Sequence, residues 1–259
     1  MILSDFHVHT TYCDGRDSPE DIVREALRLG MRRLGFSGHS YTPFDEEPCM
    51  SPEGTQDYIA EIHRLRDKYR GQIDILCGTE CDYYSEIEAG KYDYVIGSVH
   101  YINCGGVFRH VDNTPEMLQD AINEAFGGDA YALVEHYYSL VADVVRKTNA
   151  DVIGHFDLIL KLNTDNRFFD EDNPRYIAAA ESALDVLLKT GKPFEINTGA
   201  VSKGYRDFPY PSLRNLKYIA AHGGSVILSS DSHRKETLMY DFVKYESLAR
   251  SLGLKVCEL

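Results

Sequence analysis

Pairs of histidine and aspartate residues stand near both ends of this sequence. His7 and His9 close a short apolar segment at the start, and Asp231 and His233 follow a second apolar segment, residues 226–230. Side chains two residues apart on a strand point to the same face of a sheet. Each pair can therefore direct two ligand-type side chains at one metal ion.

Four more strand-like segments end on a single residue of a metal-binding type, and an acidic residue lies in the loop after His9. Neutral imidazole and carboxylate groups suit zinc, iron and manganese. The nine candidate ligands are His7, His9, Asp14, His39, Glu80, His100, His155, Asp231 and His233. One ion cannot use so many, so the pattern predicts two or three divalent ions, with Glu80 and Asp231 as the bridging carboxylates.

Such a cluster indicates a reaction. Clustered divalent ions lower the pKa of a bridging water and hold both the attacking and the leaving oxygen of a phosphoryl transfer. Six of the ten histidines fall at these strand ends, where purely structural histidines have no reason to gather. The predicted chemistry is therefore the hydrolysis of a phosphate ester.

The elements that must position these residues alternate along the chain about seven times. The predicted strands cover residues 1–9, 33–39, 73–80, 92–100, 151–155, 193–197 and 226–230. The predicted helices cover residues 18–29, 58–69, 115–126, 129–148, 174–189, 212–222 and 235–252. This alternation is typical of an α/β fold with parallel strands and right-handed crossovers. Ligands just after the strands would lie on the active face of a barrel.

Length and composition narrow the class of protein. The 259 residues, without a composition shift or linker, favour one domain over residues 1–259. The net charge of −14 argues against nucleic acid as the main partner. No apolar run reaches the length of about 18 residues that a membrane helix needs, and no signal peptide is evident. The six cysteines lack metal-site spacing, so we predict reduced thiols and a cytoplasmic protein, with its oligomeric state left open.

The motifs together resemble those of the polymerase-and-histidinol-phosphatase (PHP) superfamily, most closely its histidinol-phosphatase branch. The residues that carry the likeness are the nine ligands and the segments 9–15, 154–158, 195–200 and 210–212. The resemblance implies a distorted seven-stranded (β/α) TIM-like barrel with a trinuclear metal site. It also implies a phosphatase that acts on L-histidinol phosphate, in histidine biosynthesis.

The resemblance further implies how the ligands divide among three ions. His7, His9, Glu80 and Asp231 would hold the first ion; Glu80, His100 and His155 the second; and Asp14, His39 and His233 the third. Two positions depart from the family pattern. Many relatives have histidine where Asp14 stands, and an acidic residue often precedes the histidine that corresponds to His39, where this chain has Gly38.

Candidate substrate-binding residues lie in the loops. Lys203 and Arg206 are predicted to hold the phosphate group, with Arg109 and Lys161 as further basic residues beyond strand ends. Asp157 or His233 is predicted to protonate the leaving oxygen. The cationic part of the substrate would suit the acidic residues Asp45, Asp82 and Glu86. The tyrosines predicted to stack on an imidazole are Tyr12, Tyr41, Tyr83, Tyr84 and Tyr101.

Two alternatives to histidinol phosphate hydrolysis stay open. The same chemistry would serve another small phosphate ester, namely a nucleotide, a sugar phosphate or an oligonucleotide end, although a nuclease should show a basic groove. A PHP-like module could also bind metal as a non-catalytic scaffold, but scaffolds usually lose ligands and this set is nearly complete. The choice among zinc, iron and manganese depends on geometry that the sequence does not specify.

Overall fold

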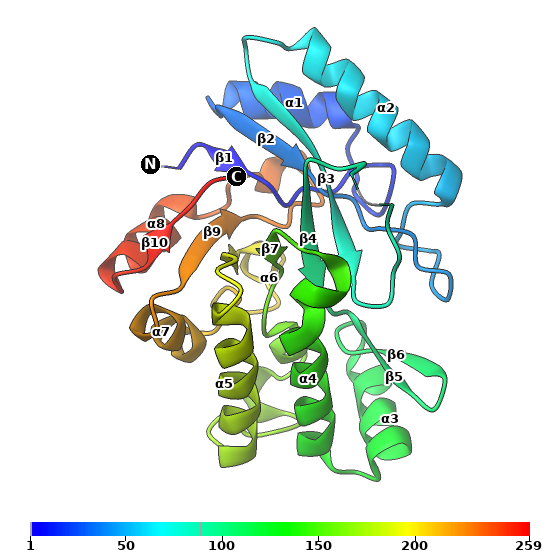
Figure 1. The fold of residues 1–259 in the computed structure, drawn as a ribbon, viewed down its shortest axis with the longest axis vertical. Coiled ribbons are helices and arrows are strands. Elements are labelled where there is room, and N and C mark those ends of the chain that lie inside the picture. Colours follow the sequence, from blue (N-terminus) through cyan, green and yellow to red (C-terminus); the bar gives the residue numbers. More distant parts are fainter. Residues whose placement is uncertain (1, 89) are drawn as a thin grey trace.

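A curled parallel sheet organises the molecule, as the computed structural model shows for residues 2–88 and 90–259 (Figure 1). Among these residues the sheet has eight strands in the order β1-β2-β3-β4-β7-β8-β9-β10, and every neighbouring pair is parallel. The strands are β1 (Ser4–Asp5), β2 (Arg33–Phe36), β3 (Asp74–Asp82), β4 (Tyr94–Ser98), β7 (Val152–Ile153), β8 (Phe194–Asn197), β9 (Ser225–Ser229) and β10 (Lys255–Val256). The predicted α/β class is confirmed.

The segments that follow β1 and β9 meet and curl the sheet. Val8 and Ser232 form a parallel bridge. The His9 amide donates to the Ser232 carbonyl at 2.8 Å, and the Ser232 amide donates to the His7 carbonyl at 3.1 Å. The sequence predicted seven strands; the eighth, β10, is a two-residue strand beside β9. Residue 1 of the first predicted strand lies outside the described residues.

Helices cover the outside of the sheet, except for the short α6 (Gly199–Ser202), which lies at the ligand end of β8 (Figure 1). The others are α1 (Pro19–Arg28), α2 (Pro52–Lys68), α3 (Pro115–Phe126), α4 (Ala130–Thr148), α5 (Pro174–Leu188), α7 (Leu213–Ala221) and α8 (Phe242–Ser251). The predicted helix over 235–252 was wrong in its first part, because Met239 and Asp241 have positive φ angles of 53° and 55°, which a right-handed helix cannot contain. Within the described chain, no helix has both the length and the apolar character to cross a membrane.

Aromatic side chains hold the strands that carry the ligands. Tyr94 lies inside the curl, and its hydroxyl is 2.6 Å from the Phe6 carbonyl oxygen and 2.9 Å from that of Phe36. A Cβ atom on Gly35 or Gly78 would come within 2.4 Å or 2.3 Å of Tyr94, so both positions require glycine. This packing fixes β1 to β4 relative to one another.

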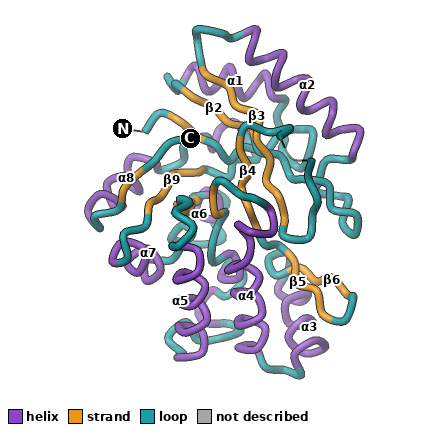
Figure 2. Tube along the Cα trace, viewed as in Figure 1, coloured by secondary structure: helices purple, strands orange, loops and turns teal. Residues whose placement is uncertain are grey.

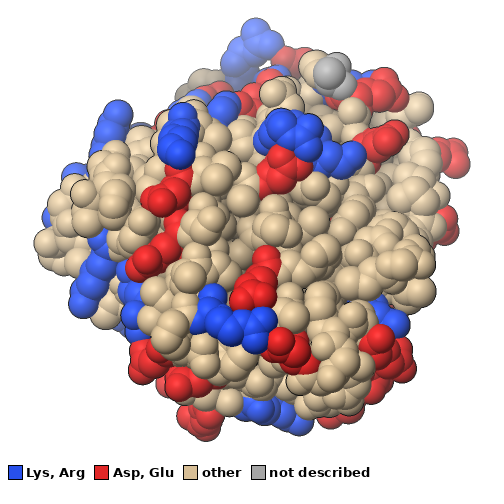
Figure 3. Space-filling model, turned by 60° about the horizontal axis from the view of Figure 1, so that its bottom comes forward, with Lys and Arg blue, Asp and Glu red and all other residues tan. Residues whose placement is uncertain are grey.

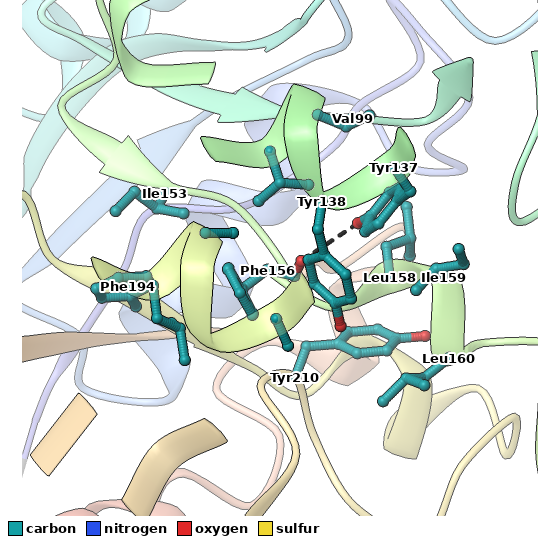
Figure 4. Packing of buried hydrophobic residues seen from close by; sticks show 14 of the residues in the cluster. Val99, Tyr137, Tyr138, Ile153, Phe156, Leu158, Ile159, Leu160, Phe194 and Tyr210 are labelled. Carbon is teal, nitrogen blue, oxygen red and sulfur yellow. Dashed lines mark hydrogen bonds between the residues drawn. The ribbon is translucent and has the colours of Figure 1, made fainter. Parts of the chain in front are cut away.

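A second packed region lies between α4, α5 and the sheet (Figure 4). Phe156 packs against both Tyr138 and Phe194 there, and the Tyr137 hydroxyl donates to the Phe156 carbonyl at 3.3 Å. Burying each such side chain stabilises the fold by roughly 1.5–3 kcal/mol. The region supports the ends of β7 and β8, next to His155.

A hairpin that the sequence did not predict lies beside the ligand-bearing strand ends. Strands β5 (Tyr101–Cys104) and β6 (Val107–His110) pair antiparallel, next to α3 (Figure 2). Gly105 and Gly106 make the turn, with φ angles of 65° and 87°. The Val111 amide donates to the His100 carbonyl at 3.0 Å, so the hairpin returns the chain to a candidate ligand.

Candidate metal centre and substrate cavity

The structure brings all nine predicted ligands together at the C-terminal ends of the strands. Three overlapping groups offer nitrogen and oxygen atoms close enough to share an ion. These groups are His9 with Asp14, His39 and His233; His7 with His9 and Glu80; and His39 with Glu80 and His100. His155 and Asp231 adjoin the same groups. The residues share one site because parallel strands end at one edge of a sheet.

The carboxylate of Glu80, on β3, lies at the middle of this cluster. Its Oε2 atom is 3.2 Å from His7 Nε2 and 3.0 Å from His39 Nδ1. Its Oε1 atom is 2.8 Å from His155 Nε2 and 3.4 Å from His100 Nε2. Each oxygen therefore faces a different set of imidazoles, which is the arrangement a bridging carboxylate needs.

Asp231 and Asp14 complete the cluster on the side of His9. Asp231 Oδ1 is 3.4 Å from His9 Nε2, and Asp14 Oδ2 is 3.0 Å from His233 Nε2. Asp231 has a positive φ angle of 50°, an uncommon conformation that tends to persist where the surroundings enforce it. A Cβ atom on Gly199 would lie 2.8 Å from the Asp231 Cβ, so glycine at that position leaves room for the ligand.

Divalent ions fit these residues. His7 Nδ1 is 2.7 Å from Glu195 Oε1; with Nδ1 as the donor, the lone pair of neutral Nε2 faces Glu80 Oε2. Neither His7 Nε2, His9 Nε2 nor Glu80 Oε2 has a hydrogen-bond partner among the described residues, and all are buried. Buried polar atoms without partners are costly, and two facing acceptors require a cation between them. A proton or a metal ion satisfies that requirement.

The charges in the cluster support the same interpretation. Burial opposes ionisation, yet His7, His39 and His100 hold the pKa of Glu80 well below its usual value. Burial also opposes the charge on His100, but Glu80 raises the pKa of His100 to about 9. Burial and the charge of His9 instead lower the pKa of His233 to about 4. His233 is thus neutral near pH 7, the state in which imidazole binds a metal.

Two acidic residues orient the predicted ligands, and neither was predicted in that role. Buried Glu195, on β8, contacts His7 and also accepts a hydrogen bond from the His155 amide at 3.0 Å. Asp82 accepts from the His100 amide at 2.9 Å, and its Oδ2 is 3.4 Å from His100 Nδ1. Carboxylates on the second nitrogen of a ligating histidine fix its tautomer and ring orientation. A glutamate within the buried segment Phe194–Asn197 was the available sequence signal for the first of them.

A cavity of about 1120 Å³ opens beside the cluster. Ligands His39, Glu80, His100, His155, Asp231 and His233 form one wall. The other walls include Asp45, Tyr101, Asp112, Lys161, Lys203 and Tyr205. Of the five tyrosines predicted to stack on an imidazole, Tyr101 lines this cavity in the described chain. Of the three predicted rim carboxylates, Asp45 and Asp82 do so.

The predicted basic residues differ in their positions. Lys203 lines the cavity, with Nζ 3.1 Å from His233 Nδ1 and 3.8 Å from Asp231 Oδ1. Lys161 also lines it and pairs with Asp112 at 2.9 Å. Arg206 lies elsewhere, because its Nη1 donates to the Leu160 carbonyl. The predicted contact between Arg206 and phosphate therefore has no support in this geometry.

Asp157 also lies away from the cavity, although it was predicted to protonate the leaving oxygen. It is fully buried, and its Oδ2 accepts from the Ser212 amide at 2.7 Å and from Asn215 Nδ2 at 2.9 Å. The chain turns into a short 3₁₀ helix, Leu158–Leu160, directly after it. The side chain consequently holds the start of α7 and does not face a substrate.

The fold and the donor set define an α/β protein with a divalent-metal site at the ends of its parallel strands. Residues 5–199 match the family model described as "PHP domain". The chain belongs to the PHP family, as its motifs predicted.

Named relatives extend along nearly the whole chain. A Deinococcus radiodurans protein named "Probable histidinol-phosphatase" is 31% identical over 97% of this chain and 94% of its own length. The Bacillus subtilis "Histidinol-phosphatase" is 26% identical over 93% of this chain and 97% of its own. A Lactococcus lactis histidinol phosphate phosphatase, solved with zinc, L-histidinol and phosphate, superposes with a TM-score of 0.73. It is 23% identical and covers 98% of this chain and 95% of that one. That likeness supports the fold.

Proposed function

We propose that this chain is a metal-dependent phosphomonoesterase that hydrolyses L-histidinol phosphate to L-histidinol and phosphate, a step of histidine biosynthesis. The observation that carries the proposal is the nine-residue ligand cluster beside an open cavity. The near full-length likeness to relatives named histidinol-phosphatase supports the choice of substrate. A cytoplasmic location and a single-domain organisation stay predictions.

The ligands would divide among the ions as the family resemblance implies. His7, His9, Glu80 and Asp231 would hold the first ion; Glu80, His100 and His155 the second; and Asp14, His39 and His233 the third. When bound, the ions would supply a water of lowered pKa and balance charge on the phosphoryl oxygens. Zinc, iron and manganese all suit these donors, and the Lactococcus relative was solved with zinc.

Two cationic side chains of this chain line the same cavity as the ligands, Lys203 directly beside His233 and Asp231. The ammonium groups of Lys203 and Lys161 would bind the phosphoryl oxygens and balance the charge that grows during attack. The leaving oxygen must gain a proton as its bond to phosphorus breaks. We assign that proton to water in the cavity, because Asp157 is sealed from it and His233 would be occupied as a ligand of the third ion.

A second candidate function, hydrolysis of an oligonucleotide end, gains no support from the face of the molecule shown in Figure 3. Acidic and basic side chains are interspersed on that face, whereas a nucleic-acid groove needs clustered positive charge. Nucleotides, sugar phosphates and the non-catalytic scaffold stay as outcomes of the test below.

The test is phosphate release by metal-loaded protein from L-histidinol phosphate, beside a panel of nucleotides and sugar phosphates. We expect a strong preference for L-histidinol phosphate, and loss of that activity in His7→Ala and Asp231→Ala. Preference for another ester would keep the metal chemistry and replace the substrate. Failure to hydrolyse any ester with metals bound would overturn the enzyme and favour the scaffold.

A further inference from the structure

One ion pair in the cavity is not used by the metal centre. Lys161 Nζ and Asp112 Oδ2 are 2.9 Å apart, and both side chains line the cavity. Each lies on the segment that leaves a candidate ligand. Asp112 comes directly after Val111, whose amide bonds to the His100 carbonyl, and Lys161 follows the 3₁₀ turn that begins after His155.

The pair therefore lies on the two segments that leave the ligands of one predicted ion. His100 and His155 both face Glu80 Oε1, at 3.4 Å and 2.8 Å. Their ring centroids are 4.9 Å apart. A phosphoryl group bound at that position would place the first carbons of its alcohol along the wall that carries the Lys161–Asp112 pair.

Asp112 combines an oxygen free for a ligand with a contacting lysine ammonium, a combination that the described contacts of Asp82 and Asp45 do not provide. Asp82 uses Oδ1 on the Tyr84 amide and Oδ2 on the His100 amide. Asp45 uses Oδ2 for both of its contacts, with the Tyr101 hydroxyl at 2.6 Å and with His110 Nε2 at 3.1 Å, and no lysine is among its described partners. The Asp112 contact with Lys161 occupies Oδ2, and no described residue hydrogen-bonds its Oδ1.

Resting on the proposed function, we propose that Asp112 is the specificity residue that binds the substrate ammonium group, while Lys161 beside it binds the phosphoryl group. The ammonium of L-histidinol phosphate is on the carbon next to the one that carries the ester oxygen, so its opposite charges lie close together. A lysine and an aspartate in contact present the complementary pair. Binding would alternate four charges, each next to its opposite.

The charge state of Asp112 suits this role. Its burial opposes ionisation, but Lys161 and His100 hold the pKa of Asp112 below its usual value. The carboxylate is therefore charged near pH 7. A hydrogen bond between ionised partners is roughly twice as strong as a neutral one. An ester that lacks the amine should therefore be hydrolysed with a lower kcat/KM than L-histidinol phosphate.

The test compares L-histidinol phosphate with its des-amino analogue, 3-(imidazol-4-yl)propyl phosphate, in metal-loaded wild type and Asp112→Asn. We expect the substitution to lower kcat/KM for L-histidinol phosphate about 10- to 100-fold, the range for losing one charge-assisted contact. The analogue should change by less than about threefold. Asp45→Asn, a matched substitution in the same cavity, should change both esters by similar factors.

A second measurement separates binding of the amine from a general disturbance of the site. Asp112→Asn should weaken inhibition by L-histidinol and leave inhibition by inorganic phosphate unchanged. Equal losses for both esters, or weaker phosphate inhibition, would mean that Asp112 only positions Lys161 and would overturn the proposal. If wild type hydrolyses other phosphate esters but neither imidazole ester, the proposed function itself is wrong, and the role of Asp112 is lost with it.

Discussion

The metal centre and the other residues that line its cavity are held by different kinds of structure. His7, Glu80 and Asp231 stand at the ends of paired strands, are largely enclosed, and are supported by carboxylates such as Glu195. Lys203 instead follows the short helix α6, and Asp112 follows the β5–β6 hairpin, so neither stands at the end of a strand of the eight-stranded sheet. The difference indicates that strand ends provide the chemistry and loops provide the choice of substrate.

The largest effect is expected from Glu80→Gln, which tests the first half of this comparison. Loss of the shared carboxylate charge should lower kcat/KM by more than about a hundredfold, the upper range for residues that only orient a ligand. Metal content per chain, measured by elemental analysis, should fall with it. Glu47→Gln is the matched control, because Glu47 lines the same cavity away from the cluster. Equal losses of kcat/KM and of bound metal in the two variants would contradict the assignment of metal binding to the strand ends.

Glu195→Gln should have the next largest effect, although Glu195 does not itself belong to the ligand groups. The neutral amide would hold His7 less firmly, so metal affinity should fall about 10- to 100-fold. Titration of metal-stripped protein, followed by calorimetry, measures this change. Excess metal should restore most of the activity. A variant that stays inactive when saturated with metal would show that Glu195 acts in another way.

Lys203→Met and Arg206→Met sharpen the comparison within a single loop. Lys203→Met removes a charge from the cavity and should lower kcat/KM about 10- to 100-fold at unchanged stability. Arg206→Met instead removes one of the two donors to the buried Leu160 carbonyl, which also accepts from the Asn163 amide at 3.1 Å. The loss should cost about 0.5–1.5 kcal/mol of stability, the usual net contribution of one hydrogen bond. Activity assays measure kcat/KM of both variants, and chemical denaturation measures their free energies of unfolding. Loss of activity without loss of stability in Arg206→Met would indicate that Arg206, and not only Lys203, contacts the substrate.

The smallest expected effect is the change in thermal stability of the metal-free protein with pH. Burial opposes the charge, but Glu80 raises the pKa of His100 to about 9, from 6.5. The resulting stability is fully present below the unfolded pKa of about 6.5 and is lost as the pH rises through about 9. We expect the Tm of metal-free protein to fall across this range, whereas metal-loaded protein should change less because an ion replaces the proton. Parallel Tm profiles would contradict this account of the cluster.

The sequence allowed the strand-end part of the molecule to be predicted well. Spacing of two residues in His7 and His9, or in Asp231 and His233, already specifies a shared face, and parallel strands bring their ends together. The positions of Asp157 and Arg206 could not be predicted in the same way. Their directions depend on contacts with the Ser212 amide and the Leu160 carbonyl, which exist only once distant segments have packed.

The same limit explains the elements that were missed. The β5–β6 hairpin follows from two glycines at positive φ, Gly105 and Gly106, within a segment that reads as an irregular excursion. The predicted start of α8 was wrong because Met239 and Asp241 adopt left-handed conformations. Their residue types alone did not predict these conformations. Asp5 accepts the Met239 amide at 3.1 Å, a long-range contact that helps hold this turn.

Reconstitution of metal-stripped protein tests the central claim most directly. Zinc, iron or manganese would be added in steps while phosphate release from L-histidinol phosphate is measured. The account predicts no turnover without metal, and full turnover only after two or three equivalents have bound. Turnover at an undiminished rate by fully stripped protein would contradict the assignment of the chemistry to the strand-end cluster.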